Sequence, residues 1–392
     1  MSDVPTINFA LFNGGPPHKL QRWIGLNPGG RPRVIRRALL AMAIMWLPLV
    51  VLAALHGDLI GRGTWDPFLF DFGAQTRFLI VPLVLIFSEL VCLPRLAALA
   101  AQFLRGGLVR TADYPRYQYA VSSTVRLMNS TSVEVIAVIL AYALVAILFW
   151  AEPLSDVPHW HGVFTATGYA LSPAGWWAKF VSLPLLLLLE LGWLWRLCLW
   201  SRFLWLMNRL DLRLIASHPD HAGGLRFVQY SVRALLPLAF AFGVLAAGPI
   251  LNAVVHLGIS PLKFKYVIAG TAIVAVIVLV GPLLIFMYRL IEEQRLGMFT
   301  YGSLALRQGA QLEGKWFRPE HTVGEEALSV SDFSSTTDLY SIVSNVYAMQ
   351  IVPLELKNLL MLVAATLLPF IPVALLSAPM DVILQKLAAL FF

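Results

Sequence analysis

The sequence has little charge. Only 13% of its 392 residues are Asp, Glu, Lys or Arg, whereas soluble domains contain roughly a quarter. Hydrophobic residues make up 58% of the chain, and even a large soluble domain buries only about three quarters of the surface that its unfolded chain exposes. Soluble globular, disordered and fibrous classes are therefore excluded, and the composition predicts an integral membrane protein.

Cysteine is also scarce. The two cysteines, Cys92 and Cys198, both lie within apolar runs. Two such residues cannot form a disulfide framework, and neither stands near a histidine at the spacing of a zinc site. We therefore expect two apolar thiols with no role in metal binding.

Long apolar runs are abundant. A helix needs about 20 predominantly apolar residues to cross roughly 30 Å of hydrocarbon. These runs do not alternate as the strands of a barrel do, and the first is too long for a signal peptide and is expected to remain as an anchor. The sequence predicts an all-α, polytopic transmembrane helical bundle of about seven spans. The runs cover about 37–56, 78–101, 132–151, 178–202, 234–257, 266–290 and 353–376.

Basic residues gather in alternate loops, and this pattern predicts the orientation. The segment before the first span and the loops after the second and fourth spans are rich in Arg and Lys, whereas the loop after the first span carries Asp58, Asp66 and Asp71. Basic loops stay in the cytoplasm, so we expect a cytoplasmic N-terminus. The net charge of +7 is then explained without nucleic acid, which is not an expected partner.

The spans and loops divide the chain into four parts. The last part is the least regular, because its apolar end at 379–392 could fold back or lie on the membrane surface. The parts are a cytoplasmic N-terminal segment at 1–36, a transmembrane core of six spans at 37–290 with a cytoplasmic loop at 205–230, a cytoplasmic segment at 291–352, and the last span with an amphipathic tail at 353–392.

The second and fourth spans share a pattern that suggests a parallel hairpin repeat. Each has a basic residue followed by Phe, then Pro-Leu, and later Glu-Leu and Arg-Leu; the register is the same from the Glu onward, and the fourth span has one residue fewer upstream. Transporters are commonly built from such repeats, with the site at the interface between them. A chance likeness between Leu-rich helices is the alternative.

Two carboxylates, Glu89 and Glu190, lie about halfway along these two spans. An ionised carboxylate near the midplane of a membrane is costly and by default marks an ion or proton path. No Lys or Arg lies near the centre of any span, so a fixed buried ion pair is not expected. The alternative to an ion path is a structural hydrogen bond between helices.

Two short segments outside the spans could bind a ligand. In the loop at 205–230, His218, Asp220 and His221 could ligate a divalent metal, and Gly223 and Gly224 could present backbone amides to an anion. A second, weaker candidate for a metal site consists of Asp156, His159 and His161. In both segments the alternative is an ordinary solvated turn. A helix is also expected after the polar stretch 329–338, continuing to Val352.

The chain resembles a group of bacterial multi-pass inner-membrane proteins that carry a His-Pro-Asp-x-Ala-Gly-Gly cytoplasmic loop and have no assigned activity. The resemblance covers roughly 205–355 and implies a bacterial cytoplasmic membrane but no mechanism. It rests on Ser217-His218-Pro219-Asp220-His221-Ala222-Gly223-Gly224, Tyr301-Gly302-Ser303-Leu304-Ala305, Lys315-Trp316, Asp332 with Ser335 and Asp338, and Met349 to Pro353.

The leading hypothesis is membrane transport, by an ion channel or a proton- or cation-coupled carrier whose path Glu89 and Glu190 line. Its partners would be the lipid bilayer and an inorganic ion or small solute, and the protein could form a homo-oligomer. One alternative is a membrane-embedded enzyme with a metal or phosphate site at His218–His221. Another is a non-catalytic scaffold or signalling component that uses the segment at 291–352.

Overall fold

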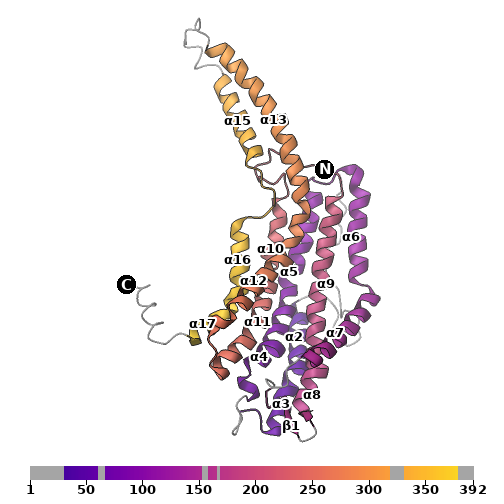
Figure 1. Cartoon of the computed structure of the whole chain (residues 1–392). Coiled ribbons are helices and arrows are strands. Elements are labelled where there is room, and N and C mark those ends of the chain that lie inside the picture. Colours follow the sequence, from indigo (N-terminus) through magenta and orange to yellow (C-terminus); the bar gives the residue numbers. More distant parts are fainter. Residues whose placement is uncertain (1–30, 61–66, 152–157, 166–167, 318–330, 378–392) are drawn as a thin grey trace.

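A computed structural model describes residues 31–60, 67–151, 158–165, 168–317 and 331–377. Long helices form an elongated bundle, and a helical hairpin made of α13 (Met287–Trp316) and α15 (Asp332–Tyr347) projects from one end of it (Figure 1). At the opposite end β1 (Gly162–Thr165) pairs with β2 (Gly168–Leu171) as a short antiparallel ribbon. We call these two ends of the bundle the hairpin end and the strand end.

The prediction of an all-α bundle with seven spans is confirmed. Seven helices in the described part of the chain are long and apolar enough to cross a membrane. Several run beyond the apolar segments from which they were predicted, because the helices continue through charged residues after the apolar residues end. They cover Val34–His56, Phe72–Arg105, Thr131–Leu148, Pro173–Asn208, Leu236–Leu257, Pro261–Trp316 and Leu356–Leu376.

Most spans are built from more than one helical element, because prolines and glycines interrupt the regular hydrogen-bond ladder. The remaining α-helices are α2 (Arg31–Met45), α3 (Leu47–His56), α4 (Phe72–Gln75), α5 (Val81–Arg105), α6 (Tyr114–Met128), α7 (Thr131–Ala151), α8 (Pro173–Trp177), α9 (Leu183–Asn208), α10 (Tyr230–Ala234), α11 (Leu236–Leu257), α12 (Lys265–Val280), α16 (Leu356–Leu367) and α17 (Ile371–Ser377).

The second and fourth spans have the same order of elements, which supports the repeat. The second begins with α4, continues through a π-helical turn at Thr76–Ile80 and becomes α5, which has a proline at its second position. The fourth begins with α8, continues through a π-helical turn at Ala178–Ser182 and becomes α9, again with a proline at its second position. π-Helical turns are rare and occur frequently at functional sites. We call these the first and second π-turns.

Aromatic side chains fill the core toward the hairpin end of the bundle. Phe103 on α5 is completely buried and packs edge-on against Phe203 of α9 and Phe227. Phe286, just before α13, stacks on the same ring. Aromatic side chains remove about 150–250 Å² each from solvent and prefer such offset and edge-on contacts. This core fixes α5, α9 and α13 to one another.

The helix predicted to continue to Val352 ends earlier, at Tyr347. The reason is a competing acceptor: the Gln350 amide donates to the carbonyl oxygen of His221 at 2.7 Å instead of to its own helix. Pro353 then cannot donate a backbone hydrogen bond at all. The chain therefore turns between α15 and α16, and this turn lies against the loop that contains His221.

Candidate functional site

Glu89 on α5 is held by two arginines. Arg37 of α2 donates from Nη1 to Oε2 at 2.5 Å and from Nη2 to Oε1 at 3.2 Å. Arg196 of α9 donates from Nη2 to Oε1 at 3.0 Å. The side chains of Arg37, Glu89 and Arg196 are 16%, 10% and 6% exposed. The expectation that no fixed buried ion pair would form is therefore wrong at Glu89.

The level of the two carboxylates can be compared with that of helix α11. This helix of 22 residues, apolar except for Asn252 and His256 near its far end, is about 33 Å long at the rise of an α-helix, which matches the hydrocarbon thickness. The thiol of Cys92 on α5 donates to the carbonyl oxygen of Ala234, just before α11, at 2.9 Å. Near the far end of α11, Nε2 of His256 lies 2.9 Å from the carbonyl oxygen of Phe70.

Phe70 and Cys92 therefore mark the two faces of the hydrophobic layer along the second span. The centre falls near Pro82, so Glu89 lies about 10 Å from it, one turn from the hairpin-end face. Arg37, the first residue of the apolar run at 37–56, pairs with Glu89 and lies at the same level. On α9, Nε1 of Trp193 donates to the carbonyl oxygen of Leu85 at 3.0 Å, and Arg196 reaches Glu89; this pairing places Glu190 beside Pro82. Both carboxylates lie about halfway along their helices, Phe72–Arg105 and Pro173–Asn208, as predicted; beside α11, Glu190 is level with the centre and Glu89 lies toward the hairpin end.

Glu190 on α9 differs from Glu89 in its partners. Its Oε1 atom is buried and accepts no hydrogen bond from the described part of the chain. The charged side chain whose field acts on it is Arg77, in the first π-turn. A buried polar atom without a partner is costly, so the surroundings of Glu190 suit a carboxyl group that can lose its charge.

Two basic residues lie on the strand-end side of Glu190. They are Arg77 in the first π-turn and Lys179, 6% exposed, in the second, and they occupy matching positions of the repeat. Both act on His161, where burial first, and then Lys179 and Arg77, lower the pKa of the imidazole to about 4. In the sequence, Arg77 and Lys179 stand out only as parts of the repeat. Their equivalent positions in the two spans could have identified them as candidate functional residues.

At the strand-end face, the buried carboxylate of Asp71 joins three segments. Its Oδ1 accepts from the Ala74 amide at 2.9 Å and from Nδ2 of Asn252 at 3.1 Å, and its Oδ2 accepts from Nε1 of Trp160 at 2.9 Å. These contacts connect the start of the second span to α11 and to the segment before β1. Asp71 is therefore fully satisfied and serves as a helix cap and a structural junction.

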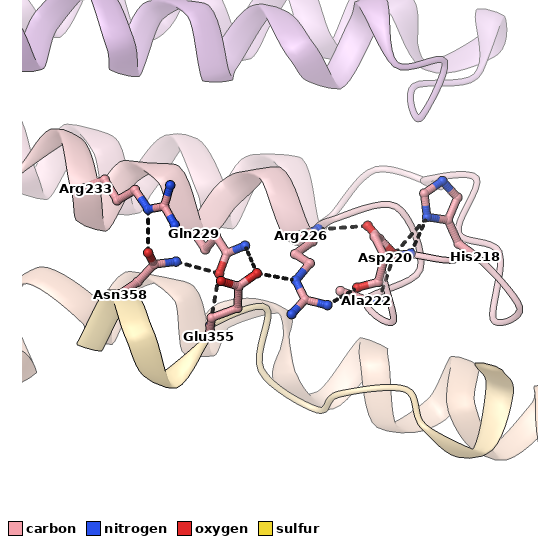
Figure 2. Close-up of polar contacts among 8 residues, drawn as sticks. All are labelled: His218, Asp220, Ala222, Arg226, Gln229, Arg233, Glu355 and Asn358. Atoms are coloured by element: carbon pink, nitrogen blue, oxygen red, sulfur yellow. Dashed lines mark hydrogen bonds and ion pairs between the residues drawn. The ribbon is translucent and has the colours of Figure 1, made fainter. Parts of the chain in front are cut away.

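In the loop at 205–230, the carboxylate of Asp220 organises the backbone (Figure 2). Its Oδ1 accepts from the amides of Ala222 at 2.9 Å and Gly224 at 3.1 Å, and its Oδ2 accepts from the amide of Arg226 at 3.1 Å. Nδ1 of His218 lies 2.8 Å from Oδ1. Burial alone raises the pKa of Asp220, but the three amides and His218 outweigh it and lower that pKa below its ordinary value.

A chain of polar contacts connects this loop to the last span (Figure 2). Nε of Arg226 donates to Oε1 of Glu355 at 3.0 Å, and the Glu355 amide donates to Oε1 of Gln229 at 2.9 Å. Asn358 on α16 then donates to Gln229 at 2.7 Å and accepts from Nε of Arg233 at 2.5 Å. Sequence reasoning did not find this series of contacts, because Arg226 and Gln229 lie more than 120 residues from their partners Glu355 and Asn358.

Of the predicted ligand residues, Asp220 and His218 contact the loop itself, whereas Nδ1 of His221 is buried without a hydrogen-bond partner among the described residues. His221 has a φ of 53°, and Gly223 and Gly224 have φ values of 64° and 94°, a left-handed conformation that glycine adopts without strain. The amide of Gly224 is occupied by Asp220. Across the described ranges, no three His, Cys, Asp or Glu side chains lie where they could share a metal ion.

The second candidate for a metal site is only partly visible. Asp156 lies outside the described residues. His159 is exposed, and Nδ1 of His161 lies 3.1 Å from the hydroxyl of Tyr169 on β2. His161 is thus positioned by a neighbouring side chain, between the strand ribbon and the basic residues of the π-turns.

These contacts define an all-helical, membrane-spanning protein with charged residues along the interface of two repeated helices. Comparison of the chain with protein-family models, with curated proteins and with solved structures finds no match. The function must therefore be argued from the site itself.

Proposed function

We propose that the chain transports an ion across the membrane along the interface between α5 and α9. The observation that carries this proposal is the buried, unpartnered carboxylate oxygen of Glu190 inside a spanning helix. Ionisable groups within spanning helices are rare, face protein or water, and by default mark ion or proton paths. A purely structural carboxylate is expected to be satisfied, as those of Glu89 and Asp71 are.

The order of charges along the interface supports this proposal. From the strand end, His161 is followed by the basic pair Arg77 and Lys179, then by Glu190. The cluster of Arg37, Glu89 and Arg196 completes the series near the hairpin-end face. Polar groups are thus present across the layer, where a static bundle needs only apolar contacts.

The two carboxylates then have different roles. Glu190 exchanges the ion, whereas Glu89 joins α2, α5 and α9 and keeps the two repeated helices in register. We further propose a bacterial cytoplasmic membrane with the N-terminus in the cytoplasm. The distribution of basic residues supports this orientation, in which the hairpin end would face the cytoplasm.

The test is charge movement in proteoliposomes, followed with a potential-sensitive dye after an imposed pH and salt gradient. The wild-type chain is expected to dissipate the potential, and Glu190→Gln is expected to reduce the rate to that of protein-free vesicles. Glu292→Gln, an exposed change on α13, is the matched control and keeps the wild-type rate. Unchanged charge movement in Glu190→Gln contradicts the proposal.

A scaffold function is the second candidate, because the α13–α15 hairpin leaves the bundle with apolar side chains exposed. Phe299 and Leu306 on α13 are 69% and 75% exposed, one above the other. Co-purification of a partner that is lost in Phe299→Ser with Leu306→Ser would support it. The enzyme alternative has less support, since the Asp220 carboxylate is occupied by backbone amides.

A further inference from the structure

We infer that the ion carried along the α5–α9 interface is the proton, and that the carboxyl group of Glu190 takes it up and releases it. This inference rests on the proposed transport function and specifies its substrate.

The number of donor atoms at Glu190 favours a proton over a metal cation. Metal cations are held by several oxygen or nitrogen ligands at once, six or more for Ca²⁺ and about six for Mg²⁺. The side chains that flank Glu190 along α9 are leucines and a tryptophan, and no group of three acidic, histidine or cysteine side chains gathers anywhere in the described part of the chain. A proton needs only one oxygen atom, and Glu190 supplies one that is buried and unpartnered.

Arg77 makes both states of this carboxyl group accessible. When Glu190 is ionised, the field of Arg77 stabilises the negative charge. In the described part of the chain Arg77 does not form a hydrogen bond or close ion pair with Glu190, so apolar neighbours favour the neutral acid. Glu89 lacks this balance, because three hydrogen bonds from two arginines hold it in the ionised form.

The same arrangement disfavours an anion as the substrate. An anion attracted to Arg77 and Lys179 from the strand end would next meet the carboxylate of Glu190, and beyond it that of Glu89. At an effective dielectric constant of about 20, two like charges 4 Å apart repel by roughly 4 kcal/mol. Transport by protonation avoids this repulsion, because the site becomes neutral when it is occupied.

The step itself is simple. A proton from water on one side of the membrane adds to the ionised carboxylate of Glu190 and forms an O–H bond. The bond breaks toward water on the other side and restores the carboxylate, so each cycle moves one positive charge. No oxidant, nucleotide or second substrate is required.

The test uses the full-length chain in proteoliposomes with a trapped pH-sensitive dye, a K⁺ gradient and valinomycin to set an inside-negative potential. The wild-type protein is expected to acidify the vesicle interior, Glu190→Gln to give the protein-free rate, and Glu190→Asp to retain a measurable part. Parallel vesicles measure uptake of radioactive Na⁺ and Cl⁻, which are expected to stay at background. Glu292→Gln is the control, as above.

The outcomes separate the two proposals. Uptake of Na⁺ or Cl⁻ without acidification overturns the proton assignment but keeps ion transport, whereas no movement of any of the three ions overturns both. A second measurement does not depend on a variant: a carbodiimide, which reacts with protonated carboxyl groups in apolar surroundings, should label Glu190 and leave Glu89 unmodified. Labelling of Glu89 alone contradicts the inference.

Discussion

Glu89 and Glu190 occupy matching positions in two repeated helices, yet their surroundings differ. Glu89 accepts three hydrogen bonds from arginines on two other helices, whereas Glu190 has a buried oxygen without a partner. The comparison teaches that similar sequence can place two carboxylates in two spans, but that only the contacts with neighbouring helices separate a structural group from a group free to exchange.

A single residue accounts for part of the difference. Glu89 follows Pro82 by seven positions, whereas Glu190 follows Pro184 by six. One residue turns a helix by about 100°, so Glu190 points away from the direction that Glu89 takes relative to its π-turn and proline. The offset persists downstream, since Arg95 follows Pro82 by 13 positions and Arg196 follows Pro184 by 12; Arg196, displaced together with Glu190, contacts Glu89 across the interface.

The largest expected effect is on the free energy of unfolding, and it tests the difference between Glu89 and Glu190. Glu89→Gln should lower the free energy of unfolding by about 3–5 kcal/mol, because breaking a buried ion pair leaves uncompensated charge, here on Arg37 and Arg196. Glu190→Gln should change it by less than about 1 kcal/mol, since no partner is lost. Thermal and denaturant unfolding of the detergent-solubilised protein measures both. Equal losses in the two variants would remove the distinction between the carboxylates.

A smaller loss of stability is expected at the carboxylate of Asp220, which accepts hydrogen bonds from backbone amides instead of from arginines. Asp220→Ala leaves the amides of Ala222, Gly224 and Arg226 without their acceptor, and each buried unsatisfied donor costs about 1–3 kcal/mol. Because this part of the loop is only partly buried, we expect a total near 2 kcal/mol. Asp211→Ala, at an exposed aspartate nearby, is the control, and proteolysis of the loop reports the change.

The contribution of the Asp220 carboxylate to stability also depends on pH in a defined way. Its pKa lies below the ordinary value, so its contribution to stability is present above the pKa of an unfolded aspartate, about 3.9, and is lost as the pH falls through the lower folded value. The loop should therefore be insensitive to pH between neutrality and about pH 5. Loosening of the loop at neutral pH without any substitution would contradict this assignment.

The smallest expected effect lies at the strand end, next to the basic residues that face Glu190. The folded pKa of His161 is about 4, below the unfolded value of about 6.5. Its contribution to stability is present above the unfolded pKa and is lost as the pH falls toward the folded one. His161→Gln should flatten the stability curve between about pH 6.5 and 4, and His159→Gln, an exposed neighbour, should not. A steeper curve in His161→Gln would refute the assignment.

The spans could be predicted because apolar length alone determines them. The Arg37–Glu89–Arg196 cluster could not, because its members are 52 and 107 residues apart and meet only when three helices pack. The halfway position of Glu89 and Glu190 could also be predicted, because it follows from the length of helix on either side of each residue. Asp220 stood out in the sequence, but its amide partners depend on the left-handed backbone at His221, Gly223 and Gly224.

The two π-turns also record the history of the chain. A π-helical turn accommodates one more residue than an α-helical turn in the same length of helix, so each is a place where a residue was added without breaking the helix. If the two spans descend from one ancestral hairpin, the added residue was present before the copy was made, because both copies carry it at the same place. The one-residue difference between the proline and the glutamate would then have arisen after the copy, by a loss in one span or a gain in the other. That difference turns Glu190 by about 100° relative to its proline and gives the two carboxylates different neighbours.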